Sequence, residues 1–89
     1  MKHAVRFRVS GKVQGVGFRA YTRRTALEFG VNGWVRNLPD GSVTGEAEGQ
    51  PRPLETFLRA VMRGPSMARV ASFQRDRIDP KGHVGFSIR

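Results

Sequence analysis

A chain of 89 residues has the size of one compact domain, so we expect a single domain over residues 1–89. The absence of cysteine excludes a disulfide framework and a thiolate nucleophile, and the wide sequence separation of His3 and His83 argues against a zinc site. The 16 lysines and arginines against 7 acidic residues give a formal net charge of +9, which attracts phosphate-bearing molecules without distinguishing a nucleic acid from a small anionic substrate.

The first third of the chain predicts a strand, a loop and a helix. Residues 2–9 alternate apolar and polar side chains, which indicates a strand with one buried face. Three glycines within residues 10–17 are too many for a regular element and predict a tight loop. From Phe18 the apolar residues recur with helical spacing, although Leu27 points away, and Gly30 is placed to cap the end of the helix.

The middle of the chain predicts a hairpin. Residues 31–36, which contain Trp34, indicate a second strand, and residues 42–48 indicate a third. The Pro-Asp-Gly sequence at residues 39–41 is typical of the tight turn that would join these two strands.

The last third predicts a second helix and two further strands. Pro51 and Pro53 open a segment whose apolar residues follow a 3.6-residue period, and the Gly-Pro pair at residues 64–65 ends it. Residues 69–75 indicate a fourth strand with weak alternation. The fifth strand is expected at the terminus, where alternation is carried by Val84, Phe86 and Ile88.

This order of elements predicts an α+β fold of the ferredoxin-like, split βαβ class. The pattern is βαββαβ with a short additional C-terminal strand, and it places two helices on one face of a mainly antiparallel sheet. The first and second strands are then parallel, because a helical crossover connects them. Since this topology supports many unrelated activities, the function has to come from the motifs.

The loop that precedes the first helix has the features of an anion site. The first N–H groups of a helix lack internal acceptors and the helix dipole makes that end positive, so a phosphate is favoured there. Arg19, in the first turn, adds a planar set of donors that suits two phosphate oxygens. By itself, the loop is also compatible with a sharp turn followed by a solvated arginine.

Two nucleotide-binding motifs are excluded at this loop. Gly15-x-Gly17-x-x-Ala20 imitates a dinucleotide-binding fingerprint, but no acidic residue follows the next strand and the chain is too short for a doubly wound sheet. The phosphate-loop motif of nucleoside triphosphatases is absent too, because no Ser or Thr follows Arg19.

Asn37 is a second candidate site residue, at the end of the predicted second strand. If the first and second strands are parallel, the glycine loop and Asn37 emerge at the same edge of the sheet. A carboxamide can both donate and accept, so Asn37 can hold a water without removing its proton. An asparagine that only stabilises the following turn is the alternative, and Asp40 has the character of a turn residue rather than a catalytic base.

Residues 9–19 and 33–43 together resemble the two signature segments of the acylphosphatase family. The resemblance covers essentially the whole chain; it is weakest over residues 76–85, and Ser66-Met67 departs from the family's usual sequence. It implies that Arg19 and Asn37 are the catalytic pair. It also implies that a phosphoryl group binds mainly to backbone amides of Gln14, Gly15, Val16, Gly17, Phe18 and Arg19. The implied reaction is hydrolysis of an acyl phosphate to a carboxylate and inorganic phosphate, with no metal and no cofactor.

Two other functions are considered. RNA-recognition domains share this topology, but residues 42–48 carry two acids and no aromatic side chain on which a base could stack, which argues against a nucleic-acid-binding module. An acylphosphatase-like module within a larger carbamoyl-transferring protein is disfavoured by the chain length. No apolar run reaches the roughly 20 residues of a membrane span, and the N-terminal segment lacks the apolar core of a signal peptide. We therefore expect a cytoplasmic monomer that acts on a small acyl phosphate.

Overall fold

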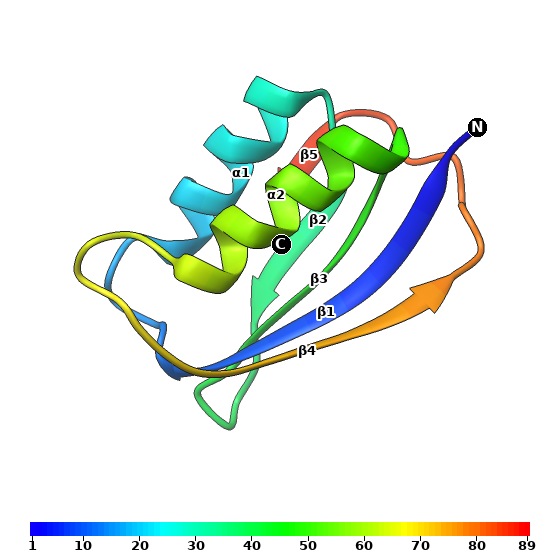
Figure 1. Ribbon diagram of the computed structural model, residues 1–89. Coiled ribbons are helices and arrows are strands. Elements are labelled where there is room, and N and C mark those ends of the chain that lie inside the picture. Colours follow the sequence, from blue (N-terminus) through cyan, green and yellow to red (C-terminus); the bar gives the residue numbers. More distant parts are fainter.

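The computed structural model describes all 89 residues and contains two helices and a five-stranded sheet. In chain order the elements are β1 (His3–Lys12), α1 (Phe18–Phe29), β2 (Asn32–Asn37), β3 (Val43–Gly49), α2 (Pro51–Arg63), β4 (Arg69–Ile78) and β5 (Phe86–Ile88). The strands lie in the order β4-β1-β3-β2-β5, and every pairing is antiparallel except that of β2 with β5. Both helices cover one face of this sheet (Figure 1). The predicted ferredoxin-like α+β fold is therefore confirmed.

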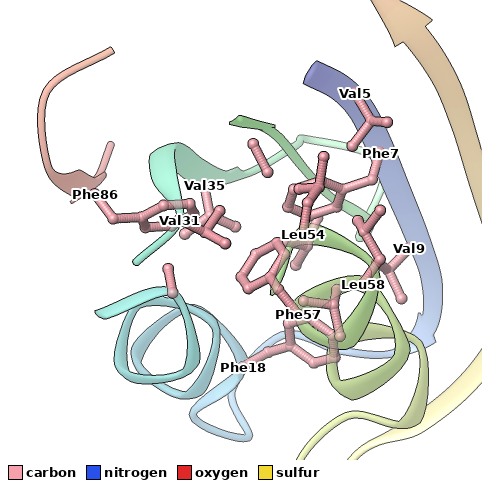
Figure 2. Packing of buried hydrophobic residues seen from close by; sticks show 14 of the residues in the cluster. Val5, Phe7, Val9, Phe18, Val31, Val35, Leu54, Phe57, Leu58 and Phe86 are labelled. Atoms are coloured by element: carbon pink, nitrogen blue, oxygen red, sulfur yellow. The ribbon is translucent and has the colours of Figure 1, made fainter. Parts of the chain in front are cut away.

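The hydrophobic core lies between the helices and the sheet. Alternation along β1 turns Val5, Phe7 and Val9 toward the helices, as the period of two predicts. The ring of Phe57 on α2 meets that of Phe7 edge to face, with 6.2 Å between the centroids. Figure 2 shows these side chains together with Phe86 of β5, so the core extends across the sheet from β1 to its far edge.

Both helices follow their predicted pattern with one exception. Leu54, Phe57, Leu58 and Val61, which are expected to share a face of α2, are buried, but Met62, expected on the same face, is 47% exposed. In α1, Leu27 is exposed and Gly30 caps the helix in the left-handed conformation, with its N–H bonded to the carbonyl of Ala26. Neither helix has both the length and the apolar character needed to cross a membrane.

Three strand boundaries differ from the predicted ones by two residues or more, and β2 and β3 each begin and end one residue later than predicted. β1 continues to Lys12, because the pairing with β4 shifts by one residue after Ser10 and Gly11 adopts φ +122° at this bulge. Gly11 therefore belongs to the strand and not to the loop. β4 extends to Ile78, beyond the predicted residue 75. The expectation that Val84 belongs to the last strand is wrong, because Val84 is 98% exposed and β5 begins at Phe86.

The segment over residues 79–85 crosses the sheet on the face that the helices leave open. β4 and β5 lie at opposite edges of the sheet, so this connection has to pass over the strands between them (Figure 1). The carboxylate of Glu48 on β3 accepts hydrogen bonds from the backbone N–H groups of Lys81, Gly82 and His83, at 2.9 to 3.1 Å. These bonds anchor the segment to the centre of the sheet.

A second carboxylate beneath the same segment is surrounded by cations. Glu46 is buried and forms ion pairs with Arg6 at 2.9 Å, Lys81 at 2.8 Å and His83 at 3.1 Å. Burial alone would raise the pKa of Glu46, but the hydrogen bonds from Lys81, Arg6 and His83 outweigh it and lower this pKa to about 2. Glu46 is therefore held as a carboxylate, and it bonds the connecting segment to β1 and β3.

Candidate active site

A pocket of about 230 Å³ lies where the glycine loop, the first turn of α1 and the end of β2 meet. All of the predicted site residues except Val16 line it; Val16 packs against the hydrophobic core instead. The complete lining is Val13, Gln14, Gly15, Gly17, Phe18, Arg19, Ala20, Asn37 and Ile88. The structure thus brings Arg19 and Asn37 to one cavity, as the sequence predicts.

The sheet register explains why these two distant segments meet. Both β1 and β2 are antiparallel to the strand between them, β3, so they run parallel to each other and end at the same edge. Val43 of β3 faces Val9 on one side and Asn37 on the other. Asn37 and Val9 are thus level across the sheet, three residues before β1 ends at Lys12 and the chain enters the glycine loop.

The start of α1 is open to an anion. Gly17 is the residue before the helix and adopts the left-handed conformation, with φ 76° and ψ 22°. No side chain caps this end of the helix, and its first turn contains no acidic residue. The first N–H groups of α1 therefore lack a side-chain acceptor, and the helix dipole favours a negative ligand beside them.

Gln14 connects the two segments of the site through its side chain. Its Nε2 atom donates one hydrogen bond to the carbonyl oxygen of Leu38 and another to that of Ser42, each at 2.9 Å. These carbonyls belong to the turn between β2 and β3, so the amide ties this turn to the glycine loop. The family resemblance assigns Gln14 a backbone contact only, and no local pattern in the sequence indicates this bridge.

The guanidinium of Arg19 is available for a ligand. Arg19 is half-buried and forms no ion pair or side-chain hydrogen bond, in contrast to Arg6, Arg8 and Arg75, which are paired with carboxylates. A cation beside uncapped helical N–H groups, with no carboxylate to neutralise it, attracts an anion strongly. The arrangement matches a phosphoryl group.

The carboxamide of Asn37 makes no bond to the protein. Its Oδ1 atom is buried without a hydrogen-bond partner, and its side chain does not satisfy the following turn as an ordinary turn asparagine would. An unsatisfied buried acceptor costs about 1–3 kcal/mol, so groups of this kind are rare and commonly serve a ligand or a water. The unpaired oxygen distinguishes Asn37 from a residue that only shapes the turn.

Asp40 takes the turn role expected of it. Its Oδ1 atom accepts hydrogen bonds from the backbone N–H of Ser42 at 3.0 Å and from the Ser42 hydroxyl at 2.6 Å, and its other oxygen pairs with Arg8. The hydrogen bonds from Ser42, together with Arg8, lower the pKa of Asp40. A carboxylate with a lowered pKa is a weak base, which suits a structural residue at the margin of the site.

Comparisons with known proteins identify the family of this fold. The chain is a small ferredoxin-like domain with a pocket at an uncapped helix start. The family model described as "Acylphosphatase" matches residues 5–88. The chain belongs to the acylphosphatase family. It is 45% identical to an acylphosphatase of Thermotoga maritima over 86 residues, which are 97% of this chain and 96% of the relative.

Solved structures give the same result. The crystal structure of acylphosphatase from Bacillus subtilis superposes with a TM-score of 0.95 at 37% identity, covering 100% of this chain and 99% of that one. Within the larger HypF of T. kodakarensis, a region matches with a TM-score of 0.84 at 31% identity. That match covers 98% of this chain but 12% of the HypF chain. The predicted family membership is therefore confirmed.

The open face of the sheet does not favour the nucleic-acid alternative. Its one tryptophan, Trp34, has the guanidinium of Arg89 at 4.8 Å and that of Arg36 at 5.5 Å from the ring centroid. β3 contributes no aromatic side chain, and its Glu46 and Glu48 add negative charge to this face. Bases that stack on a sheet need several exposed aromatic rings, and among the strands this face offers Trp34, whose ring already has two guanidinium groups over it.

Proposed function

We propose that this chain is an acylphosphatase that hydrolyses the carboxyl-phosphate anhydride bond of acyl phosphates, giving a carboxylate and inorganic phosphate. The observation that carries the proposal is the single pocket that unites an uncapped helix start, the unpaired guanidinium of Arg19 and the unpaired carboxamide oxygen of Asn37. Family membership supports the same activity.

The first step of the proposed mechanism is phosphate binding. The backbone amides over residues 14–19 surround the phosphoryl oxygens, and Arg19 binds two of these oxygens through its planar donors. In phosphoryl transfer the negative charge is spread over the three equatorial oxygens in the transition state. Donors that are already oriented toward this charge lower the barrier without reorganisation during the reaction.

The second step is attack by water on the phosphorus. Asn37 accepts a hydrogen bond from the water through Oδ1, which has no other partner, and so directs its lone pair along the line of attack. The P–O bond to the acyl group breaks as the new P–O bond forms, and the electron pair leaves with the carboxylate. A phosphoryl oxygen takes the proton of the water in this proposal, because the pocket holds no side chain suited to act as a strong base.

A metal is not required by this scheme. No group of three or more His, Cys, Asp or Glu side chains is arranged to hold an ion. Arg19 and the helix start supply the positive charge that a metal contributes in many other phosphoryl-transfer sites. Turnover in the presence of a chelator is therefore the expected result.

The test is hydrolysis of acetyl phosphate, with a chelator present, by the parent chain and by Arg19→Ala. Loss of an arginine that stabilises such a transition state costs roughly 10³ to 10⁵ in rate, so this variant should be nearly inactive. Arg52→Ala is the matched control, because Arg52 lies in the first turn of the other helix and outside the pocket. Full activity of a folded Arg19→Ala protein would refute the assignment of Arg19.

We also propose that residues 1–89 form one domain that unfolds as a single cooperative unit and is active as a monomer. A single buried cluster of 15 residues includes side chains from β1, both helices, β2, β3 and β5, which supports one core. Coincident urea transitions from tryptophan fluorescence and circular dichroism would agree with this proposal, and sedimentation would give the oligomeric state. Two separated transitions would contradict it.

A further inference from the structure

The proposed mechanism leaves one side of the pocket without a role. The glycine loop, Arg19 and Asn37 account for its polar wall, but Ala20 and Ile88 also line it. Both are apolar and solvent-accessible, and Ile88 is 43% exposed. The side chain of Ile88 offers an anion neither a hydrogen bond nor a charge. We therefore expect it to contact another part of the ligand.

The topology places this apolar surface at the open side of the pocket. β5 is the edge strand beside β2, and Ile88 pairs with Val35, two residues before Asn37. Helix α1 packs against β2 and β5, which brings Ala20 of its first turn to the same pocket. Ala20 and Ile88 are exposed to solvent, whereas the other apolar lining residues, Val13 and Phe18, are buried, so a group attached to a bound phosphate contacts Ala20 and Ile88 where the pocket opens.

Ile88 is held firmly although it is the penultimate residue. The backbone N–H of Arg89 donates to the carbonyl of Val35 at 2.8 Å, and Nε of Arg23 donates to the carbonyl of Phe86 at 3.1 Å. The Phe86 ring is buried against Phe57, with 5.8 Å between the ring centroids. β5 is therefore fixed to β2, to α1 and to the core, and Ile88 forms a defined wall.

We propose that Ile88 and Ala20 form an acyl-binding surface, which makes acyl phosphates with an apolar acyl group better substrates than acetyl phosphate. This inference rests on the proposed function and names the substrate class of the same site. A pocket of about 230 Å³ is smaller than the roughly 300–1,000 Å³ of sites for drug-sized ligands, which suits a phosphoryl group with one compact acyl group. Covering Ile88 with a ring or branched chain removes apolar surface from water, which favours binding.

The test compares kcat/KM for benzoyl phosphate with that for acetyl phosphate in the parent chain and in Ile88 variants, because the difference in leaving-group reactivity is the same for every variant and cancels when their ratios are compared. We expect the parent chain to prefer benzoyl phosphate by about five- to tenfold, because an open surface buries only part of the ring. Ile88→Ala and Ile88→Asn should each lower this ratio at least threefold, the first by removing apolar surface and the second by making it polar. Ile88→Leu should keep the ratio within about twofold, because it preserves apolar area. Val84→Ala is the control for aliphatic truncation, because Val84 is almost fully exposed and lies outside the pocket.

The outcomes separate this inference from the proposed function. Hydrolysis of both substrates with a ratio that no Ile88 variant changes would overturn the acyl-binding surface and leave the hydrolase intact. Failure of the folded parent chain to hydrolyse either substrate would overturn both. Succinyl phosphate is a third arm, because a preference for it over benzoyl phosphate would show that the acyl group meets a cation and not an apolar surface, and would also overturn the proposal.

Discussion

Gln14 and Leu38 are 24 residues apart in the chain, yet the side-chain amide of the first donates to the backbone carbonyl of the second at 2.9 Å. The same nitrogen also donates to the carbonyl of Ser42 at 2.9 Å, which engages both of its hydrogens. One side chain therefore joins the loop that surrounds the anion site to the turn that follows Asn37. We expect the relative position of Arg19 and Asn37 to depend on this bridge.

The first prediction concerns substitutions that remove the Gln14 bridge. Gln14→Glu replaces the donor with a carboxylate that faces two carbonyl oxygens and a phosphate site, so we expect a loss of about 2–3 kcal/mol in unfolding free energy and at least a 100-fold loss in kcat/KM. Gln14→Ala should cost about 1–2 kcal/mol and lower kcat about tenfold, because the loop loses its attachment without gaining a charge. Urea unfolding and steady-state kinetics measure the two effects.

Gln74→Glu is the control for this change, since Gln74 lies exposed on β4 and makes no side-chain hydrogen bond. It should alter neither quantity appreciably. Equal activity of the Gln14→Glu and Gln74→Glu proteins would show that the bridge has no part in holding the site together.

The second prediction concerns Asn37 and separates activity from stability. Asn37→Ala removes the acceptor for the attacking water, so kcat should fall roughly 10²- to 10³-fold while the inhibition constant of inorganic phosphate changes less than threefold. The same change removes a buried oxygen without a partner, so the unfolding free energy should stay constant or rise by up to about 1 kcal/mol. A variant that binds phosphate poorly but turns over normally at saturation would reverse the roles assigned to Asn37 and the loop.

The sequence predicts most of this site because its main parts are local. A glycine loop before an amphipathic segment identifies the helix start, and the strand-helix-strand order implies that Arg19 and Asn37 meet at one sheet edge. Contacts that depend on strand register cannot be predicted from local sequence patterns in the same way. The Gln14 bridge, the strand bulge at Gly11 and the position of Ile88 at the mouth all follow from how β3, β4 and β5 align with their neighbours.

Composition alone also does not reveal how charge is distributed on the open face of the sheet. The net charge of +9 indicates a positive molecule, but Glu46 and Glu48 are buried on the open face under residues 79–85. This segment is where the family resemblance is weakest, and no periodicity marks it. Its position is determined by long-range bonds to β3.

The third prediction compares alanine substitutions of the glycines at the two ends of α1. Gly17 and Gly30 adopt similar left-handed conformations, at φ 76° and φ 67°, and a methyl group added to either meets nothing within 4 Å. Alanine at each should therefore cost a similar 1–2 kcal/mol of backbone strain. Only Gly17→Ala disturbs the anion site, so it alone should weaken inhibition by phosphate, by about tenfold. Equal phosphate affinities in the two variants would indicate that the loop conformation is not needed for binding.

The fourth prediction concerns acid stability and Glu46. The pKa of Glu46 is about 2 in the folded chain against an ordinary 4.5, so its carboxylate form stabilises the fold. Because the pKa is lowered on folding, this stabilisation is complete above about pH 5 and is lost as the pH falls from 4.5 toward 2. At about 1.4 kcal/mol per pKa unit, the contribution at pH 7 is up to about 3 kcal/mol.

Glu46→Gln tests this, because the amide keeps the shape of the side chain but cannot pair with Arg6 and Lys81 as an anion does. Urea unfolding between pH 7 and pH 2 should show a variant that is about 2–3 kcal/mol less stable at pH 7 and approaches the parent at pH 2. Glu28→Gln is the reference, since Glu28 is exposed on α1 and forms no ion pair, and its stability curve should follow that of the parent. A constant difference between the Glu46→Gln protein and the parent over the whole pH range would attribute the loss to packing alone, because only a titrating carboxylate produces a difference that shrinks with acid.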